Sequence, residues 1–187
     1  MLRDMDRNVF DALVIGAGIA GASAAAHLAA DRRVALIEAE DAPGYHTTGR
    51  SAAMWIRNYG PPAVQDMTGL SRPFFEAPPP GFSDTPIMLR RPVLFLAPPE
   101  DVAQLRGMLE AGFGLREIST AGAAAMVPAL RPGWAAMAAV EADSFDMDVD
   151  ALLQGFLRLL RARGGALALR SRAGRIERRG GAWEVEV

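Results

Sequence analysis

The sequence contains no cysteine and only two histidines, His27 and His46. The lack of cysteine excludes disulfides, thiolate catalysis and cysteine metal sites. His27 falls within a helical pattern, and neither imidazole has further metal ligands that the sequence places beside it. We therefore predict that the protein has no metal site.

Long apolar runs and an excess of positive charge are also missing. No run reaches the ~18 residues of a membrane-spanning helix, so we expect no transmembrane segment. The formal net charge of -2 provides no basic field for nucleic acid or anionic lipid. With 50% hydrophobic and 22% charged residues in 187, the chain has the composition of a folded, cytoplasmic protein of one domain or slightly more.

A glycine-rich turn is the strongest motif in the chain. The apolar run 12–15 predicts a strand and leads into Gly16-Ala17-Gly18-Ile19-Ala20-Gly21, which has G-x-G-x-x-G spacing. Gly16 allows a sharp exit from the strand, Gly18 lets a pyrophosphate approach the backbone, and Gly21 lets the next helix lie close. Ile19 and Ala20 complete the motif, and the small residues 22–30 predict a helix whose first turn presents free N–H groups to the phosphates.

An acidic residue follows at the distance that this motif requires. Residues 34–37 predict a second strand that ends at Glu38, about 20 residues beyond the glycines, where a carboxylate would bind ribose hydroxyls. The same carboxylate would repel the 2′-phosphate of NADP, so FAD and NAD remain as cofactors. Strand, turn, helix, second strand and acid together predict a dinucleotide-binding unit.

A secretory signal is the alternative interpretation of this segment. The run 13–26 would be its apolar core, and Ala22-Ser23-Ala24 imitates a cleavage site. Acidic residues at Asp4, Asp6 and Asp11 stand where a signal carries positive charge, so we favour the dinucleotide-binding unit.

A second cluster of functional side chains lies at His46-Thr47-Thr48-Gly49-Arg50-Ser51-Ala52-Ala53. Its hydroxyls, flexible glycine and guanidinium suit contacts with the phosphates and ring edges of a cofactor. The same residues also suit a helix start that is capped by Thr48 or Ser51, with Arg50 in solvent. The residues alone leave both interpretations open.

The composition changes after residue 77. The prolines at 78–80 predict a stiff linker, and residues 78–142 then predict an α+β segment. Its expected elements are a β-rich stretch at 87–97, a helix from 98 to Gly112 or Gly114, a helix between Ser119 and Pro128, and a strand at 134–142.

The last part of the chain, residues 143–187, resembles the first in its apolar pattern. Asp148 or Asp150 is expected to cap a helix that Gly164-Gly165 ends. A strand is expected at 166–169. A short alternating piece at 173–176 then leads through Arg178-Arg179-Gly180-Gly181 into residues 182–187, which predicts a hairpin.

Several segments resemble one protein family. The glycine turn, Glu38 and the block Pro43-Gly44-Tyr45-His46-Thr47-Thr48-Gly49-Arg50-Ser51-Ala52-Ala53 are similar to the N-terminal half of FAD-dependent amine and amino-acid oxidoreductases of the D-amino-acid oxidase superfamily, and within it to D-arginine dehydrogenase-like proteins. The similarity continues at Tyr59-Gly60, Ser71-Arg72-Pro73-Phe74-Phe75, Pro79-Pro80-Gly81-Phe82, Asp148-Val149-Asp150-Ala151-Leu152 and Gly181-Ala182-Trp183-Glu184-Val185. It therefore covers nearly the whole chain.

This resemblance implies roles for individual residues. Thr48, Arg50, Ser51 and Ala52 match the family loop that contacts the flavin, and the backbone near Ala173 matches a segment that contacts the adenine. Tyr59 matches a tyrosine that touches the substrate. The family members are about twice as long, so the resemblance implies that a C-terminal half or a second subunit completes the fold.

Two positions depart from the arginine-specific pattern of the family. Met54 stands where those members have a histidine near the flavin, and Val93 stands where they have a glutamate. An unpaired guanidinium in a dry pocket is very costly, and Val93 cannot pair with one. We therefore expect an apolar or small amino acid or amine as substrate.

The sequence thus predicts an incomplete α/β protein. Residues 1–77 and 143–187 would form a Rossmann-like FAD-binding domain, and residues 78–142 would form a segment on the substrate side. We expect oxidative deamination of a small-molecule amino acid or amine, with no general base assigned in this half. A non-catalytic module that binds FAD or NAD is the rival prediction.

Overall fold

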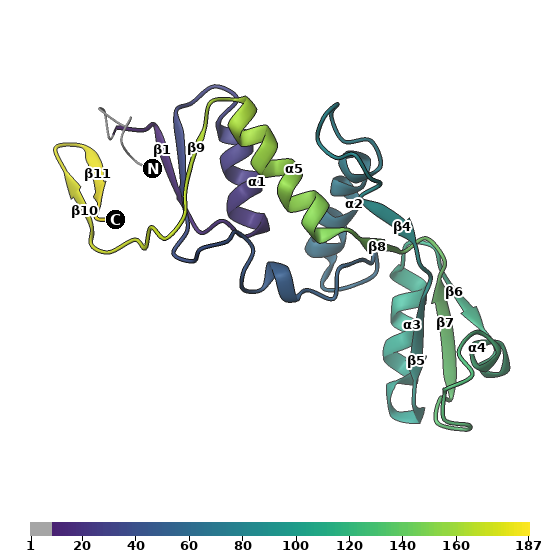
Figure 1. The fold of residues 1–187 in the computed structure, drawn as a ribbon. Coiled ribbons are helices and arrows are strands. Elements are labelled where there is room, and N and C mark those ends of the chain that lie inside the picture. Colours follow the sequence, from purple (N-terminus) through teal and green to yellow (C-terminus); the bar gives the residue numbers. More distant parts are fainter. Residues whose placement is uncertain (1–8) are drawn as a thin grey trace. The chain divides into compact units, whose positions relative to one another are not determined.

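The computed structural model describes residues 9–187, and their contacts divide the chain into two units (Figure 1). Unit 1 contains the chain up to Ala52, together with Pro79–Ile87 and Asp148–Val187. Unit 2 contains Ala53–Pro78 and Met88–Met147. These boundaries differ from those predicted at residues 77 and 142. Asp4 and Asp6, whose negative charge disfavours a secretory signal, lie outside the described residues.

Unit 1 is built on a parallel sheet with the strand order β1-β2-β9. Its strands are β1 (Ala12–Ile15), β2 (Val34–Ile37) and β9 (Ala166–Ala168). All four residues of the central strand β2 are buried, as expected for an apolar strand covered on both faces. This arrangement confirms the predicted α/β class and the predicted strand, turn, helix and second strand.

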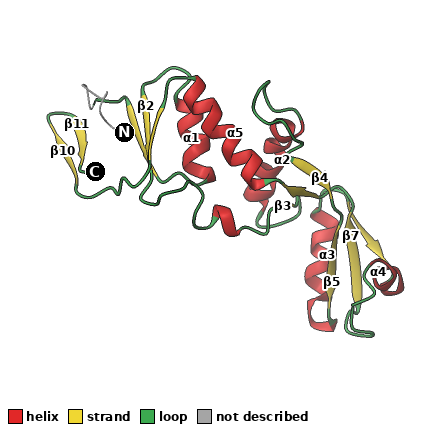
Figure 2. Ribbon diagram, viewed as in Figure 1, coloured by secondary structure: helices red, strands yellow, loops and turns green. Residues whose placement is uncertain are grey.

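Two helices pack side by side in unit 1, α1 (Ile19–Leu28) and α5 (Val149–Ala162) (Figure 2). The buried residues of α1 are alanines, which allow close packing against the leucines and Phe156 on the buried side of α5. The Asp148 side chain accepts a hydrogen bond from the Ala151 N–H at 2.8 Å and caps α5 as predicted. Gly164 lies just after the helix with φ of +77°, which favours glycine.

The end of the chain forms an antiparallel hairpin of β10 (Ile176–Arg179) and β11 (Ala182–Val185). The hairpin was predicted, but only Ile176, the last residue of the short alternating piece expected at 173–176, lies in a strand. Residues 173–175 form no strand: Gly174 and Arg175 both bond to Glu186, with the Gly174 N–H donating to Glu186 O at 2.7 Å and the Glu186 N–H donating to Arg175 O at 3.0 Å, so the one-to-one pairing of the ladder ends at Ile176. These bonds tie the segment to the end of the hairpin as a loop.

Unit 2 contains two antiparallel sheets, with strand orders β3-β8-β4 and β5-β7-β6. The first consists of β3 (Met54–Trp55), β8 (Phe145–Met147) and β4 (Met88–Arg90), and the second of β5 (Val93–Ala97), β7 (Met137–Glu141) and β6 (Leu115–Ile118). The stretch predicted to be β-rich at 87–97 therefore supplies one strand, β4, to the first sheet and one strand, β5, to the second. Pro92 lies between them and cannot donate a ladder hydrogen bond.

Three α-helices belong to unit 2: α2 (Pro62–Glu76), α3 (Val102–Ala111) and α4 (Thr120–Met126). A single 3-10 turn, η2 (Pro99–Asp101), precedes α3, whose Leu105 packs in a core with Ala97 and Met137. Ser119 caps α4 by accepting a hydrogen bond from the Gly122 N–H at 3.0 Å. The helices α3 and α4 confirm the prediction, whereas α2 was not predicted.

Within residues 9–187, no helix is both long enough and apolar enough to cross a membrane.

Candidate functional site

The glycine turn of unit 1 has a backbone that only glycine fits at two positions. Gly16 has φ of +97°, in the left-handed region that L side chains rarely adopt, and its N–H donates to Ile37 O at 2.7 Å. A Cβ at Gly21 would lie 1.9 Å from Gly16 O, which no repacking could accommodate. The turn therefore keeps the start of α1 directly against the end of β1.

The N-terminus of α1 is capped from a distant part of the chain. Gly18 is the N-cap residue and has no side chain to accept a hydrogen bond, so the Ile19 N–H donates instead to Thr48 Oγ1 at 3.0 Å. A Cβ at Gly18 would lie 3.0 Å from the same hydroxyl oxygen. Thr48 thus accepts a hydrogen bond from one of the free N–H groups at the start of the helix. Its own hydroxyl proton can still be donated to a phosphate.

This contact shows which helix Thr48 caps. Thr48 begins a 3-10 helix, η1 (Thr48–Arg50), in which no side chain makes a capping hydrogen bond. Thr48 therefore caps α1 and not, as the capping interpretation had expected, a helix of its own cluster. Thr48 reaches the glycine turn, Arg50 lies 5.5 Å from the Tyr45 ring centroid, and Ser51 and Ala52 are exposed.

A buried glycine holds this loop against the turn. The Gly44 N–H donates to Ala17 O at 3.0 Å, and the Gly49 N–H donates to Gly44 O at 2.8 Å. Gly44 has φ of +74°, and a Cβ there would lie 2.6 Å from Leu153. The loop backbone is therefore fixed next to the start of α1, where a bound phosphate would need it.

Glu38 connects the second strand to the same turn. Its Oε2 accepts a hydrogen bond from the Ala17 N–H at 2.7 Å, and its Oε1 accepts one from the Glu40 N–H at 3.1 Å. Burial alone would raise the pKa of Glu38, but the N–H groups of Glu40, Ala17 and Ala39, with the nearby His46, hold this pKa below its ordinary value. The side chain is thus kept as a carboxylate at the turn.

The segment that precedes Ala173 is bound to the same strand end. The Glu38 N–H donates to Ala168 O at 2.8 Å, and the Ser171 N–H donates to Glu38 O at 2.7 Å. Ala173 itself is half-buried two residues further on. The structure therefore brings together the glycine turn, Thr48, Glu38 and the segment leading to Ala173.

The three predicted substrate residues all belong to unit 2. Met54 lies half-buried on β3, the Tyr59 side chain is 71% exposed, and Val93 opens β5. Val93 is paired in register with Glu141, so both side chains lie on the same face of the sheet. An acidic residue is therefore present beside Val93, which the sequence pattern did not reveal.

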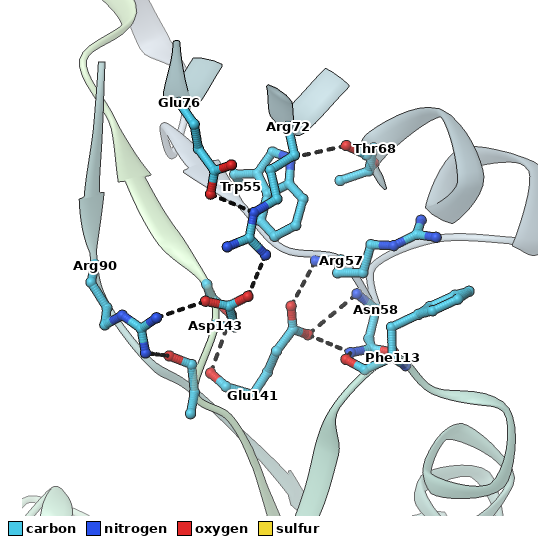
Figure 3. A network of polar contacts seen from close by, with 12 residues as sticks. Trp55, Arg57, Asn58, Thr68, Arg72, Glu76, Arg90, Phe113, Glu141 and Asp143 are labelled. Carbon is cyan, nitrogen blue, oxygen red and sulfur yellow. Dashed lines mark hydrogen bonds and ion pairs between the residues drawn. The ribbon is translucent and has the colours of Figure 1, made fainter. Parts of the chain in front are cut away.

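Glu141 is fully buried and bound to backbone (Figure 3). Its Oε1 accepts from the Arg57 N–H at 2.7 Å, and its Oε2 accepts from the Asn58 N–H at 3.2 Å and from Asn58 Nδ2 at 2.8 Å. Asn58 in turn binds both the N–H and the C=O of Phe113. The carboxylate is therefore committed to holding residues 57–58 in place.

A second polar group in the same view centres on Asp143, which binds Arg72 and Arg90 (Figure 3). The hydrogen bond from Arg72 is the main reason that the pKa of Asp143 is lowered, and burial opposes this effect. Arg72 also binds Glu76 one helical turn away at 2.7 Å. No sequence motif marked these residues, because the partners are separated by up to 71 positions.

The donor set of unit 1 fits the adenosine diphosphate part of FAD. The bare backbone at Gly18, the N-terminal N–H groups of α1 and the Thr48 hydroxyl suit phosphates, and the Glu38 carboxylate suits ribose hydroxyls. In the part of the chain that the structure describes, no group of three His, Asp or Glu side chains could hold a metal ion.

Solved structures with this fold include two oxidases and a deaminase. Glycine oxidase from Geobacillus kaustophilus is 18% identical with a TM-score of 0.80, and the match covers 94% of this chain and 50% of that one. L-amino acid deaminase from Proteus vulgaris is 17% identical with a TM-score of 0.78, and the match covers 95% of this chain and 43% of that one. L-alpha-glycerophosphate oxidase from Mycoplasma pneumoniae, solved with FAD bound, is 14% identical with a TM-score of 0.78, and the match covers 96% of this chain and 50% of that one.

The chain thus spans half or less of the length of these proteins. Its sequence from residue 11 to residue 187 matches the family described as DAO, FAD dependent oxidoreductase. The match includes the glycine turn, the Thr48 loop and Glu38, whose geometry suits the nucleotide end of the cofactor. The chain therefore belongs to the DAO family of FAD-dependent oxidoreductases, and its cofactor is FAD.

Proposed function

We propose that this chain is the N-terminal half of an enzyme that oxidatively deaminates an amino acid, in particular a D-amino acid, or a related amine. When bound, FAD would supply the acceptor for a hydride from the substrate Cα, and water would hydrolyse the resulting imine. The residues of this chain would bind and orient the cofactor and would form part of the substrate side. The proposal is supported by the fold that this chain shares with glycine oxidase and L-amino acid deaminase.

The observation that carries this proposal is the convergence on the α1 N-terminus. Thr48 and Glu38 come from different segments, and each binds a backbone N–H of the glycine motif, at 3.0 Å and 2.7 Å. We expect Thr48 and Arg50 to act on the phosphates, and Ser51 and Ala52 to lie near the ring, as the family resemblance implies. Gly16, Gly18, Ile19, Ala20, Gly21 and Ala173 would complete the cofactor contacts through their backbone.

The exposed edge of β1 supports the idea that more polypeptide completes the fold. β1 is an outer strand of a parallel sheet, its residues are only partly buried, and the Ile15 side chain is 51% exposed. Parallel strands are normally buried on both sides, and an open apolar edge is a template for another strand. We propose that a C-terminal half or a second subunit adds strands beside β1.

We propose that the substrate side chain is apolar or small, and that the enzyme does not favour D-arginine. Val93 offers no charge, and the carboxylate of its neighbour Glu141 already accepts three hydrogen bonds from residues 57–58. A substrate guanidinium beside Val93 would therefore lack a free acidic partner. Tyr59 and Met54 would provide the remaining contacts from this half.

Turnover by the completed enzyme tests this substrate class. We expect D-leucine and D-methionine to be oxidised with a higher kcat/KM than D-arginine, as followed by the reduction of an added electron-accepting dye. A strong preference for D-arginine would refute the proposed pocket. Fractionation of cells would test the cytoplasmic location, which is also part of this proposal.

The rival function is a nucleotide-binding module that catalyses nothing. It is favoured by the contacts of Thr48 and Glu38, which suit a bound nucleotide and give neither residue a catalytic role. An absorption spectrum of the purified chain, recorded before and after an amino acid is added, separates the two functions. Flavin bands that bleach with substrate support the enzyme, whereas bands that no amino acid bleaches, even in the completed protein, support the rival.

A further inference from the structure

A groove of about 850 Å³ lies within unit 2, between α2 and the Phe113 loop. The residues that line it include Trp55, Arg57, Asp66, Leu70 and Phe113. Its volume lies in the range of small-molecule sites. Met54, Tyr59 and Val93 do not line it, so the groove is separate from the residues predicted to contact the substrate.

The groove is built around the guanidinium of Arg57. This group lies 3.7 Å from the Phe113 ring centroid, in a cation–π contact. On α2, a Cβ at Gly69 would lie 2.5 Å from Arg57 Cζ, so the absence of a side chain there makes room for the guanidinium. Phe113 and Gly69 together fix the position of the charge.

The charge of Arg57 is incompletely paired. Its Nη1 is buried without a hydrogen-bond partner among the described residues, and the side chain as a whole is only 17% exposed. The carboxylate of Asp66 lies 3.6 Å from Nη2, which is too long for a hydrogen bond, and the Asp66 side chain is 68% exposed. A buried donor without a partner is unfavourable. Because Nη1 itself is enclosed, a ligand in the groove would meet only the exposed part of the Arg57 side chain.

The backbone beneath Arg57 is held rigidly. Glu141 accepts hydrogen bonds from the backbone N–H groups of Arg57 and Asn58, and the Asn58 side chain binds both backbone groups of Phe113 (Figure 3). The guanidinium and the ring that it contacts are therefore held by one buried network. Such preorganisation lowers the entropy that ligand binding must overcome.

The charges around the groove favour a ligand that carries both signs. Arg57 and Arg72 face Asp66 and Asp143 across the lining, so a simple anion or cation would meet a like charge. Arg72 and Asp143 already bind each other, whereas Arg57 and Asp66 form only a long ion pair of 3.6 Å. A ligand that carries a carboxylate and an ammonium group would replace this long pair with two charged contacts. The Leu70 side chain is 81% exposed and Phe113 is 45% exposed, so both present apolar surface to a ligand.

We propose that this groove binds an α-amino acid zwitterion with an apolar side chain. Arg57 would bind the carboxylate, the exposed carboxylate of Asp66 would bind the ammonium group, and Leu70 and Phe113 would contact the side chain. The inference does not rest on the proposed enzymatic function, because it concerns binding in unit 2 and involves no flavin.

Calorimetric titration of the full 187-residue chain without added FAD tests this site. Leucine, 4-methylpentanoate and 3-methylbutylamine are the probes, because the second lacks the ammonium group and the third lacks the carboxylate. We expect leucine to bind about tenfold tighter than either analogue, since each missing charge removes a charged hydrogen bond. The Trp55 indole signal in NMR spectra should shift with leucine.

Variants locate the binding at the two charges. Arg57→Met should weaken leucine binding about tenfold or more, and Asp66→Asn should remove most of the preference for leucine over 4-methylpentanoate. Asp66 is exposed, so this second variant tests the site even if Arg57→Met fails to fold. Arg91→Met removes an exposed arginine that pairs with Asp146 in the same unit, and it should leave the affinity unchanged.

Three outcomes would overturn the proposal. The first is no measurable leucine binding by the wild-type chain, as would occur if the groove is a seat for further polypeptide. The second is tighter binding of 4-methylpentanoate than of leucine. The third is an affinity for leucine that neither Asp66→Asn nor a folded Arg57→Met variant changes.

Discussion

The carboxylate of Glu38 accepts a hydrogen bond from the backbone N–H of Ala17 at 2.7 Å and so joins the end of β2 to the glycine turn. The two residues are separated by 21 positions, and the bond fixes the distance between the parts that would bind the ribose and the phosphates. The acidic side chain therefore supports the turn itself, in addition to the ribose contact that we propose for it.

Glu38→Gln should lower stability in a pH-dependent way. The lowered pKa of Glu38 means that its contribution is fully present above the ordinary value of 4.5 and is lost as the pH falls through the lower pKa of the folded state. At pH 7 we expect a loss of about 1 kcal/mol from the weakened hydrogen bonds of Ala17 and Glu40. Thermal unfolding of both proteins between pH 7 and pH 3 measures this, and a difference that stays constant would contradict it.

Gly21→Ala should damage the cofactor site. The new Cβ would lie 1.9 Å from Gly16 O, so α1 would have to move away from β1. We expect at least a tenfold loss of FAD affinity and a destabilisation of about 2 kcal/mol. Gly107→Ala is the matched control, because it lies in a helix with open space around it and should stabilise the protein by up to about 1 kcal/mol. Fluorescence titration with FAD compares the two variants.

Thr48→Val should expose the contribution of the long-range cap. Valine keeps the shape of the side chain but leaves the Ile19 N–H without its acceptor, which should cost about 1 kcal/mol of stability and weaken FAD binding several-fold. Thr47→Val is the control, because Thr47 is exposed and is bonded through its carbonyl oxygen to the Arg50 N–H. Equal FAD affinities for the two variants would contradict a role for Thr48 at the phosphates.

Glu141→Gln should strongly destabilise unit 2. An amide group would direct its own N–H groups at the donors of Arg57 or Asn58, in a site where Glu141 is only 1% exposed. We expect a loss of about 2–3 kcal/mol, as for a buried group left without its partner. Urea unfolding followed by tryptophan fluorescence measures the loss. Glu110→Gln, on the exposed side of α3, should change stability by less than about 0.5 kcal/mol.

The sequence predicted the nucleotide unit well because its determinants are local. Glycine spacing, apolar strands and the cap at Asp148 each act within a few residues, so their order along the chain was enough. The exception is Thr48: the residue could be singled out, but its partner Ile19 lies 29 positions away, and only the fold brings the two together.

Unit 2 was harder to predict for two physical reasons. The helix α2 contains Gly69 and Pro73, which weaken a helical pattern, and it has no fully buried residue to produce a clear apolar stripe. The network around Glu141 depends on contacts across 83 and 84 positions, and a lone glutamate in a strand carries no sign of such partners. The groove at Arg57 depends on this same network.

The route of the chain between the two units also has a consequence for biosynthesis. Unit 1 is assembled from three separate segments, and α5, which covers α1, comes from the last of them. During translation the glycine turn and α1 therefore emerge from the ribosome long before α5, the helix that covers α1. We expect nascent chains that end before residue 148 to expose the alanine face of α1 and to be candidates for chaperone binding until the third segment arrives.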